Sequence, residues 1–219
     1  MSTLEGMDER ISAAGVAYEQ AVFSGDHTGL AEAERSLDAV EADVALARGR
    51  LLHARFLRDG TEDPRELALF ERAAELYQST GDVRGEGEAL FWIACVHQVI
   101  HGDHAKALPF LERSRACAVK AGDNLTLSYV LRHLGFVHHQ EGRLDEAEAT
   151  FEESTRLRRD LDFPAGVAAN LVALAAIAAD QGRRDDASQA LDEAEQLARE
   201  AQAHAVRTWI DEARANLSL

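Results

Sequence analysis

A glycine recurs at a nearly constant interval along this 219-residue chain. Gly60, Gly102, Gly142 and Gly182 stand 42, 40 and 40 residues apart, and the segments around the last two are similar. A fixed period of this length is typical of stacked helical hairpins, in which each repeat packs only against its neighbours. The period therefore predicts an array of hairpins rather than one closed globule.

The local sequence favours helix throughout. Apolar residues recur three and four positions apart, there are only three prolines, and no segment shows the alternation of a strand. Most breaks contain a glycine, which can close a helix in the left-handed conformation, or an aspartate, which can cap the next helix. We therefore expect an all-α protein that forms a single array over residues 1–219.

The breaks divide this array into about five antiparallel hairpins and a final amphipathic helix. The first two repeats should pair helices 8–24 with 28–40 and 42–58 with 64–79. The full set of expected repeats is 8–40, 42–79, 84–121, 124–161 and 165–201, followed by a C-terminal capping helix over 203–217.

Three local patterns carry further expectations. Asp63, Pro64 and Glu66 indicate a capped helix start in which the glutamate is the third helical residue. Pro109 lies several residues inside its helix and should kink that helix or move its start. Trp209 and Ile210 should cover the last hairpin, because a terminal repeat otherwise exposes its stacking face.

Small residues recur where the two helices of a hairpin should come closest. The small positions and the large residues beside them are Cys95, Gly135 and Ala175, then Ala107, Ala147 and Ala187, with Leu111, Phe151 and Leu191. Small against large residues allow the ridges of one helix to enter the grooves of another at about 8–10 Å. The pattern predicts tight packing at these positions.

These positions resemble the signature of the tetratricopeptide repeat family, in which a Leu-Gly pair and a turn glycine precede an alanine, an aromatic and a small residue. The best copy is Leu131, Leu134, Gly135, His138, Gly142, Ala147, Phe151 and Ser154, with His138 where tyrosine is usual. The spacing near 40 exceeds the family's usual length of about 34 and is similar to the longer repeats of kinesin light chains and of the sensor arms of several bacterial transcription activators. The resemblance covers about residues 42–201 and implies a right-handed superhelical α-solenoid.

The resemblance also implies that ligands lie against the first helices of the repeats, on the concave side of the array. By family register the inward side chains include Arg50, Leu57, Arg58, Trp92, Val96, Val99, Ile100, Tyr129, Arg132, Phe136, His139 and Val172. The middle of this predicted groove is apolar and aromatic and arginines border it, so it suits an amphipathic or apolar peptide with an acidic group near one end. In an alternative interpretation, these side chains only contact neighbouring helices or the C-terminal helix.

Charge and composition narrow the classes of partner. The formal net charge is −16, from 39 acidic and 23 basic side chains, which disfavours nucleic acids and anionic membrane surfaces as partners. The chain has no apolar run long enough to span a bilayer and no secretory signal pattern, so we expect a cytoplasmic protein. It also lacks a glycine-rich phosphate loop and a nucleophile elbow, so we expect neither an enzyme nor a cofactor.

The histidines suggest a different hypothesis. His97 and His101 stand four residues apart on one helix face, and His133 and His138 lie on the neighbouring first helix. Two histidines at that spacing can share a zinc ion, although a pair without a glutamate beside the first histidine is a weak signal.

Three functions remain in order of preference. The first is a protein- or peptide-binding adaptor or scaffold that recruits another protein, or a peptide segment with an acidic end, through the predicted groove. The second is a regulatory sensor that responds to a ligand or peptide and acts on a separate partner. The third is a metal-binding or enzymatic protein that uses the histidines. Self-association through the terminal faces is also open.

Overall fold

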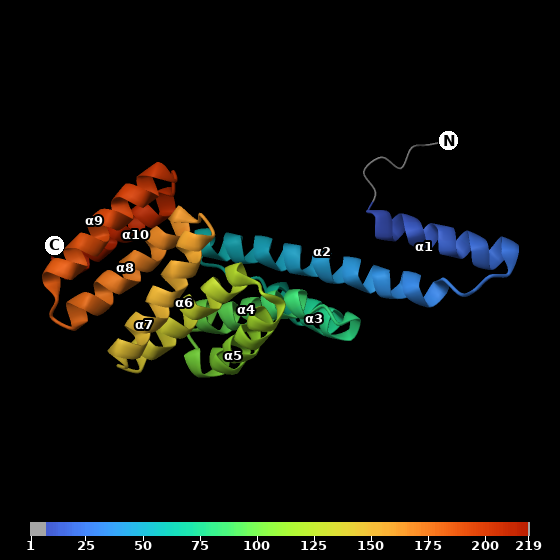
Figure 1. The fold of residues 1–219 in the computed structure, drawn as a ribbon, viewed down its shortest axis with the longest axis horizontal. Helices are drawn as coiled ribbons and strands as arrows, with labels where there is room; N and C mark the ends of the chain where they lie inside the picture. Colours follow the sequence, from blue (N-terminus) through green and yellow to red (C-terminus); the bar gives the residue numbers. More distant parts are fainter. Residues whose placement is uncertain (1–7, 219) are drawn as a thin grey trace. The chain divides into compact units, whose positions relative to one another are not determined.

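The computed structural model describes residues 8–218, and this part of the chain contains helices and no strands (Figure 1). The prediction of an all-α helical-repeat fold is confirmed. The α-helices are α1 (Glu9–Glu19), α2 (Leu30–Asp59), α3 (Arg65–Thr80), α4 (Val83–Cys95), α5 (His104–Ala121), α6 (Asn124–Gln140), α7 (Leu144–Asp160), α8 (Pro164–Asp180), α9 (Arg184–Glu200) and α10 (His204–Leu217). Short π-helical turns extend α1 over Gln20–Ser24 and α4 over Val96–Ile100. None of these helices is long and apolar enough to cross a membrane.

The chain divides into two compact units, the first ending at Asp103 and the second beginning at His104. In the first unit α1 packs on α2, α2 on α3 and α3 on α4. In the second unit α5 to α9 pack in consecutive pairs, and α10 packs on both α8 and α9. Each unit is therefore built from neighbouring helices, and the expected single array from end to end stays a prediction.

Helix α2 differs from its prediction. Helices were expected at 28–40 and 42–58, but α2 runs unbroken from Leu30 to Asp59, so the predicted break near residue 41 is wrong. The sequence around that point is rich in alanine and acidic residues and holds no glycine or proline, so nothing there ends a helix. The resulting helix is about 45 Å long, and it packs against both α1 and α3.

The second unit follows the predicted hairpins closely. Helices α6 and α8 begin at Asn124 and Pro164, which stand 40 residues apart. The capping helix is present as α10, and its Ile210 is completely buried against α8 and α9 as expected. Trp209 instead remains 44% exposed, so this residue does not cover the last hairpin.

Left-handed residues close the helices at the predicted breaks. Gly102, Gly142 and Gly182 have φ angles of 66°, 74° and 78°, which glycine adopts without steric cost. The breaks after the second helices use the same conformation, at Gly81 and Gly122 with φ of 77° and 67° and at Asp162 and Gln202, both with φ of 53°. The family's turn glycines therefore mark only one of the two kinds of turn in the repeat.

The predicted close packing of small and large residues is present within the second unit. Gly135 and Phe151 illustrate it: a Cβ atom added at Gly135 would lie 2.6 Å from the Phe151 ring, so only glycine leaves room for that ring. Phe151, Ala147 and Ala175 are all completely buried. Glycine at this position therefore serves helix contact and not a turn.

Two of the local patterns have different roles from those expected. Glu66 is the second residue of α3, and its side chain is buried, 1% exposed, rather than capping the helix. Asp63 does cap the helix start, because its side chain accepts a hydrogen bond from the backbone N–H of Arg65 at 3.0 Å. Pro109 lies inside α5, which nevertheless begins at His104, so the proline does not move the start of the helix.

Candidate functional site

In the first unit, the Trp92 ring belongs to an aromatic cluster. Its centroid lies 5.7 Å from that of Phe70 in a stacked arrangement, and 5.2 Å from Phe91 and 5.3 Å from His53 in edge-on arrangements. The Arg50 guanidinium lies 5.8 Å from the same ring. Trp92 is half-buried, so packing within the unit already uses much of the surface that was expected to anchor a ligand.

The other predicted groove residues of this unit differ in exposure. Val96 is 1% exposed and is unavailable to a ligand, which corrects that part of the predicted groove. Leu57 and Val99 are exposed, and Ile100 is half-buried. Arg58 is exposed and forms an ion pair with the next residue of the chain at 2.6 Å.

In the second unit, the predicted groove residues lie on the first helices of two hairpins. Tyr129, Arg132, Phe136 and His139 belong to α6 and Val172 to α8, and all five are half-buried. The Arg132 guanidinium lies 4.8 Å from the centroid of the Phe136 ring. His139 Nε2 lies 2.7 Å from a carboxylate oxygen of the last residue of α8. The structure therefore joins α6 to α8 through side chains that were predicted to face a ligand.

Two arginine side chains converge on Asn170 of α8. Arg132 Nη1 donates to Asn170 Oδ1 at 3.0 Å and to the Ala169 carbonyl at 2.8 Å. Arg158 Nη1, from α7, donates to the same Oδ1 at 3.0 Å and to the Gly166 carbonyl at 2.8 Å. One amide oxygen thus accepts from both guanidinium groups.

The other side of the Asn170 amide fixes its orientation. Nδ2 donates to the hydroxyls of Ser154 at 2.8 Å and Thr155 at 3.2 Å, and Ser154 donates to the Ser128 carbonyl at 2.6 Å. Asn170 and Ser154 are completely buried and Arg158 is 1% exposed. The network therefore crosses α6, α7 and α8 inside the second unit.

Both arginines hold their charge without a carboxylate partner among residues 8–218. Burial lowers the pKa of Arg158 to about 10, and burial together with repulsion from Arg158 lowers the pKa of Arg132 to about 9. The Arg158 guanidinium lies 4.9 Å from the Tyr129 ring, and its Nη2 has no hydrogen-bond partner. The two positive charges are therefore surrounded by neutral hydrogen-bond acceptors and aromatic rings. Such an arrangement favours the binding of an anion nearby.

Sequence reasoning missed Arg158 and Asn170. Arg158 lies on α7, the second helix of its hairpin, whereas the predicted groove was confined to first helices. Asn170 is the one polar residue that interrupts the apolar run within 167–179. An amide in the middle of such a run must be hydrogen-bonded when it is buried, and this was the available signal.

A second buried polar pair lies in the first unit. Glu66 Oε1 of α3 lies 2.8 Å from His53 Nδ1 of α2, and both side chains are buried. The second carboxylate oxygen, Oε2, has no hydrogen-bond partner. This pair holds together the two helices that flank the aromatic cluster.

Glu66→Gln is expected to remove part of the pH dependence of stability. Burial raises the pKa of the Glu66 carboxyl above its ordinary value of 4.5, so the folded protein holds this proton more tightly than the unfolded chain does. The resulting stabilisation is complete below the unfolded-state pKa and is lost as pH rises through the folded-state pKa. The free energy of unfolding of the wild type should therefore fall relative to that of Glu66→Gln as pH rises above 4.5. Urea unfolding at a series of pH values measures this difference, and parallel curves for the two proteins would contradict it.

The four histidines of the metal hypothesis have other contacts. The rings of His97 and His101 lie 5.6 Å apart, and His101 Nε2 lies 3.0 Å from Glu62 Oε1. His133 packs edge-on against an aromatic ring of its own helix, and His138 contacts an arginine in the following turn. Among the described residues, no three histidine, cysteine, aspartate or glutamate side chains form a cluster that could hold a metal ion. The metal hypothesis therefore has no support from the geometry.

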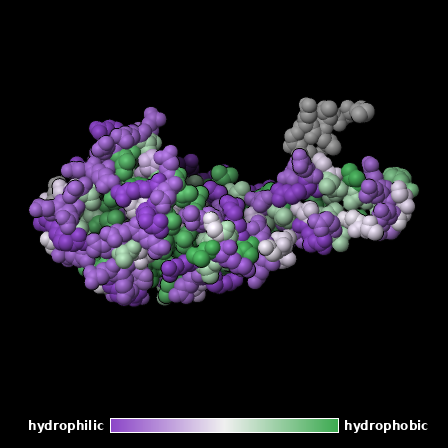
Figure 2. Space-filling view, in the orientation of Figure 1, coloured by the Kyte–Doolittle hydropathy of each residue, from purple (hydrophilic) through white to green (hydrophobic). Residues whose placement is uncertain are grey.

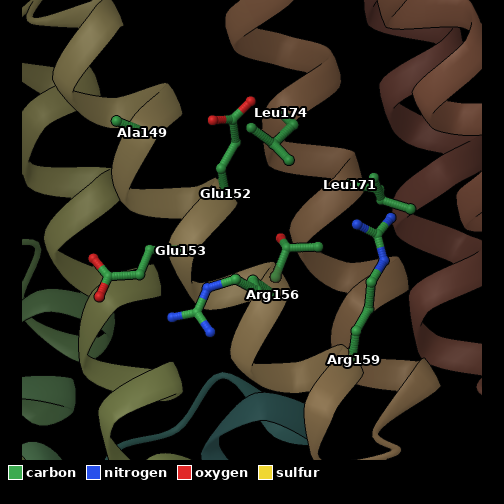
Figure 3. A pocket seen from close by; sticks show the side chains of 8 residues that line it. Ala149, Glu152, Glu153, Arg156, Arg159, Leu171 and Leu174 are labelled. Carbon is green, nitrogen blue, oxygen red and sulfur yellow. The ribbon is translucent and has the colours of Figure 1, made fainter.

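Two surface hollows lie in the second unit. The larger, of about 520 Å³, lies between α7 and α8, and Figure 3 shows charged side chains of α7 around two leucines of α8. Its lining residues are Ala149, Glu152, Glu153, Thr155, Arg156, Arg159, Leu171 and Leu174. The smaller, of about 390 Å³, lies between α5 and α6 and is lined by Leu108, Glu112, Arg115, Ala116, Val119, Leu134 and His138. None of the predicted groove residues lines either hollow.

Comparison with known proteins supports the family. Residues 126–200, which span nearly all of α6 and the whole of α7, α8 and α9, match the family model described as tetratricopeptide repeat. No curated protein matches the chain. One similar solved structure is the "Crystal structure of BtubC (BKLC) from P. vanneervenii", with 15% identity, a TM-score of 0.45, and coverage of 89% of this chain and 90% of that chain. The tetratricopeptide-repeat resemblance inferred from the glycine and alanine signature is confirmed for residues 126–200, which match the model of that family.

Proposed function

We propose that this chain is a cytoplasmic, non-catalytic adaptor that binds a protein or peptide segment through helices α6 and α8 of its second unit. Tetratricopeptide repeats commonly mediate protein–protein interaction, and the first helices of such repeats present the usual binding surface. The matched segment contains nearly all of α6 and the whole of α8. The proposal therefore rests on the family and on the side chains that these two helices present.

The proposal rests mainly on the hydrogen bonds and the unneutralised charge of Arg132. Its Nη1 makes two hydrogen bonds from α6 to α8, and no carboxylate neutralises its charge among residues 8–218. Its pKa of about 9 keeps the side chain protonated at neutral pH. Hydrogen bonds between a guanidinium and a carboxylate are among the stronger polar contacts, particularly where water is partly excluded. Arg132 is thus prepared to receive a carboxylate of a bound peptide.

The side chains beside Arg132 indicate the chemistry of the rest of the ligand. Phe136 lies under the Arg132 guanidinium, and Tyr129 and Val172 are half-buried residues of the same two helices. Aromatic and aliphatic surface beside one cation suits a peptide that combines an apolar side chain with an aspartate, a glutamate or a free carboxyl end. This is the ligand class expected from the sequence, now confined to the second unit.

A displayed library of short peptides selected against the full chain tests the proposal. Each selected peptide is synthesised in two forms, with its acidic groups as carboxylates or as amides. The wild type should bind the carboxylate form at least about tenfold more tightly, which corresponds to one hydrogen bond to a charged group. Arg132→Met should bind the two forms equally, since the group that distinguishes them is gone.

Arg156→Met is the matched control, because Arg156 is an exposed arginine of the same unit that pairs with Asp160 at 3.2 Å. It should keep the full preference for carboxylates. Thermal unfolding of each variant shows whether the fold is retained. Equal binding of the two peptide forms by the wild type, or an equal loss in Arg156→Met, would exclude Arg132 as the binding group.

A further inference from the structure

Helix α2 in the first unit carries a stripe of exposed apolar side chains. Leu30, Leu37, Val44 and Leu51 follow one another at intervals of seven residues and are 40%, 38%, 42% and 64% exposed. Seven residues are close to two helical turns, so the four side chains share one face. This face lies opposite the buried residues of α2, which pack on α3. A continuous apolar stripe at this interval is typical of a helix that pairs with another helix.

Charged residues lie between the apolar ones on the same face. Glu34 and Glu41 occupy the first half of the helix, and Arg48 and Arg55 occupy the second half, four residues after Leu30, Leu37, Val44 and Leu51 respectively. All four charged side chains are exposed. The stripe is therefore acidic at one end and basic at the other, although the whole chain carries a net charge of −16.

Helix α1 does not cover this stripe. It contacts α2 beside the stripe, where its Arg10 Nη2 lies 2.7 Å from Asp43 Oδ2 and its Ala17 lies near Gly29. Tyr18 of α1 and Val22 of the π-helical turn that extends it are 63% and 54% exposed, and they extend the apolar surface of the hairpin. Figure 2 shows hydrophobic residues scattered among hydrophilic ones on the part of the molecule formed by α1 and α2.

We propose that α2 pairs with α2 of a second copy of this chain, antiparallel, across a two-fold axis beside Val44. In this register Leu37 packs against the partner's Leu51, and Val44 meets the partner's Val44. The same register places Glu34 opposite the partner's Arg55 and Glu41 opposite the partner's Arg48. By symmetry each contact occurs twice except the one on the axis, which gives a self-complementary interface.

The charges select this arrangement over the other ways to cover the stripe. A parallel pair would place Glu34 and Glu41 against the same residues of the partner, and each arginine against its own copy, which is repulsive throughout. A staggered antiparallel pair would lose either the apolar contacts or the opposite charges. The paired segment from Glu34 to Arg55 is about 30 Å long, enough for six layers of side chains in contact. The interface lies in the first unit and is independent of the peptide-binding function proposed for the second.

Charge reversal tests the orientation. Sedimentation equilibrium of the full chain should show a dimer for the wild type. The double variant Arg48→Glu, Arg55→Glu places acids against acids at all four ion pairs and should raise the dimer Kd by at least about tenfold. Adding Glu34→Arg and Glu41→Arg restores opposite charges in the fourfold variant, which should regain most of the affinity. Glu41 also contacts Arg72 of α3 at 2.7 Å, so helical circular dichroism and thermal unfolding must show that each variant stays folded.

Disulfide trapping tests the axis. Under mild oxidation Val44→Cys should form a covalent dimer with itself, because the two side chains meet on the two-fold axis. Leu37→Cys alone should not, but an equimolar mixture of Leu37→Cys and Leu51→Cys should. The wild type serves as the background control, since it contains the buried Cys95 and the half-buried Cys117.

Five results would overturn the proposal. They are a monomeric wild type at all concentrations, an unaffected Kd in the double variant, no recovery in the fourfold variant, trapping of Leu37→Cys with itself, and a dimer that persists in Val44→Glu. Trapping of Leu37→Cys with itself would indicate a parallel pair, and a persistent Val44→Glu dimer would place the interface elsewhere. Peptide binding by the second unit should be unchanged in all these variants, so the two proposals fail separately.

Discussion

Asn170→Leu is expected to lower the free energy of unfolding by about 3–5 kcal/mol. Leucine has the branched shape of asparagine but a larger volume and no polar atoms, so the change removes the hydrogen bonds and also crowds a completely buried site. It leaves the Nη1 groups of Arg132 and Arg158 without their shared acceptor and leaves the Ser154 hydroxyl without its donor. Chemical denaturation followed by circular dichroism measures the loss. A cost below about 1 kcal/mol would show that the network contributes little to stability.

A second substitution shows where that cost arises. Arg158→Met removes one of the two buried charges and keeps a long flexible side chain. Combined with Asn170→Leu, it should restore part of the lost stability, because an uncompensated buried charge costs more than a well-packed apolar side chain. Additive losses in the double variant would instead show that the two side chains act independently.

Phe151→Ala is expected to cost about 3–5 kcal/mol. Phe151 is completely buried, its ring lies 5.1 Å from that of Phe136, and it fills the space above Gly135. Its removal opens a cavity between α6 and α7 that the neighbouring backbone can close only in part. Differential scanning calorimetry on the wild type and the variant gives the change in stability.

Gly135→Leu provides the complementary test at the same contact. Alone it should destabilise the hairpin by at least about 3 kcal/mol, because even a Cβ atom at this position lies 2.6 Å from the Phe151 ring. In the Phe151→Ala background the new side chain enters the vacated space, so the double variant should be more stable than either single variant. Failure of this rescue would mean that glycine at 135 is required by its backbone rather than by the ring.

Much of the second unit could be predicted because its signals are local. The 40-residue spacing, the turn glycines and the paired small and large residues each belong to one hairpin, and the helices begin within a few residues of the predicted positions. The first unit was harder, since α2 has no breaker at the point where a repeat boundary was assumed. A repeat signature that fades toward the N-terminus does not show where one helix ends.

The candidate site was predicted only in part. Tyr129, Arg132, Phe136, His139 and Val172 were expected to lie together, and they belong to two first helices of the second unit. The hydrogen-bond partners of these residues were not predicted. Asn170 accepts hydrogen bonds from arginines that are 12 and 38 positions away in the sequence, and the two guanidinium groups that meet there repel each other. Register along a helix indicates which way a side chain points but not what lies opposite it.

The sequence by itself determined the all-helical repeat and, except for the break wrongly expected within α2, the places where helices end, since apolar periodicity and left-handed glycines act within a few residues. It also contains the charge order of the α2 stripe, which can be recognised only when exposure shows that this face is uncovered. Tertiary structure alone decided that Arg132 is half-buried beside a second cation, that Val96 is inaccessible and that Glu66 pairs with His53. Burial and charge coupling depend on which helices pack together, and no single segment of the chain specifies that.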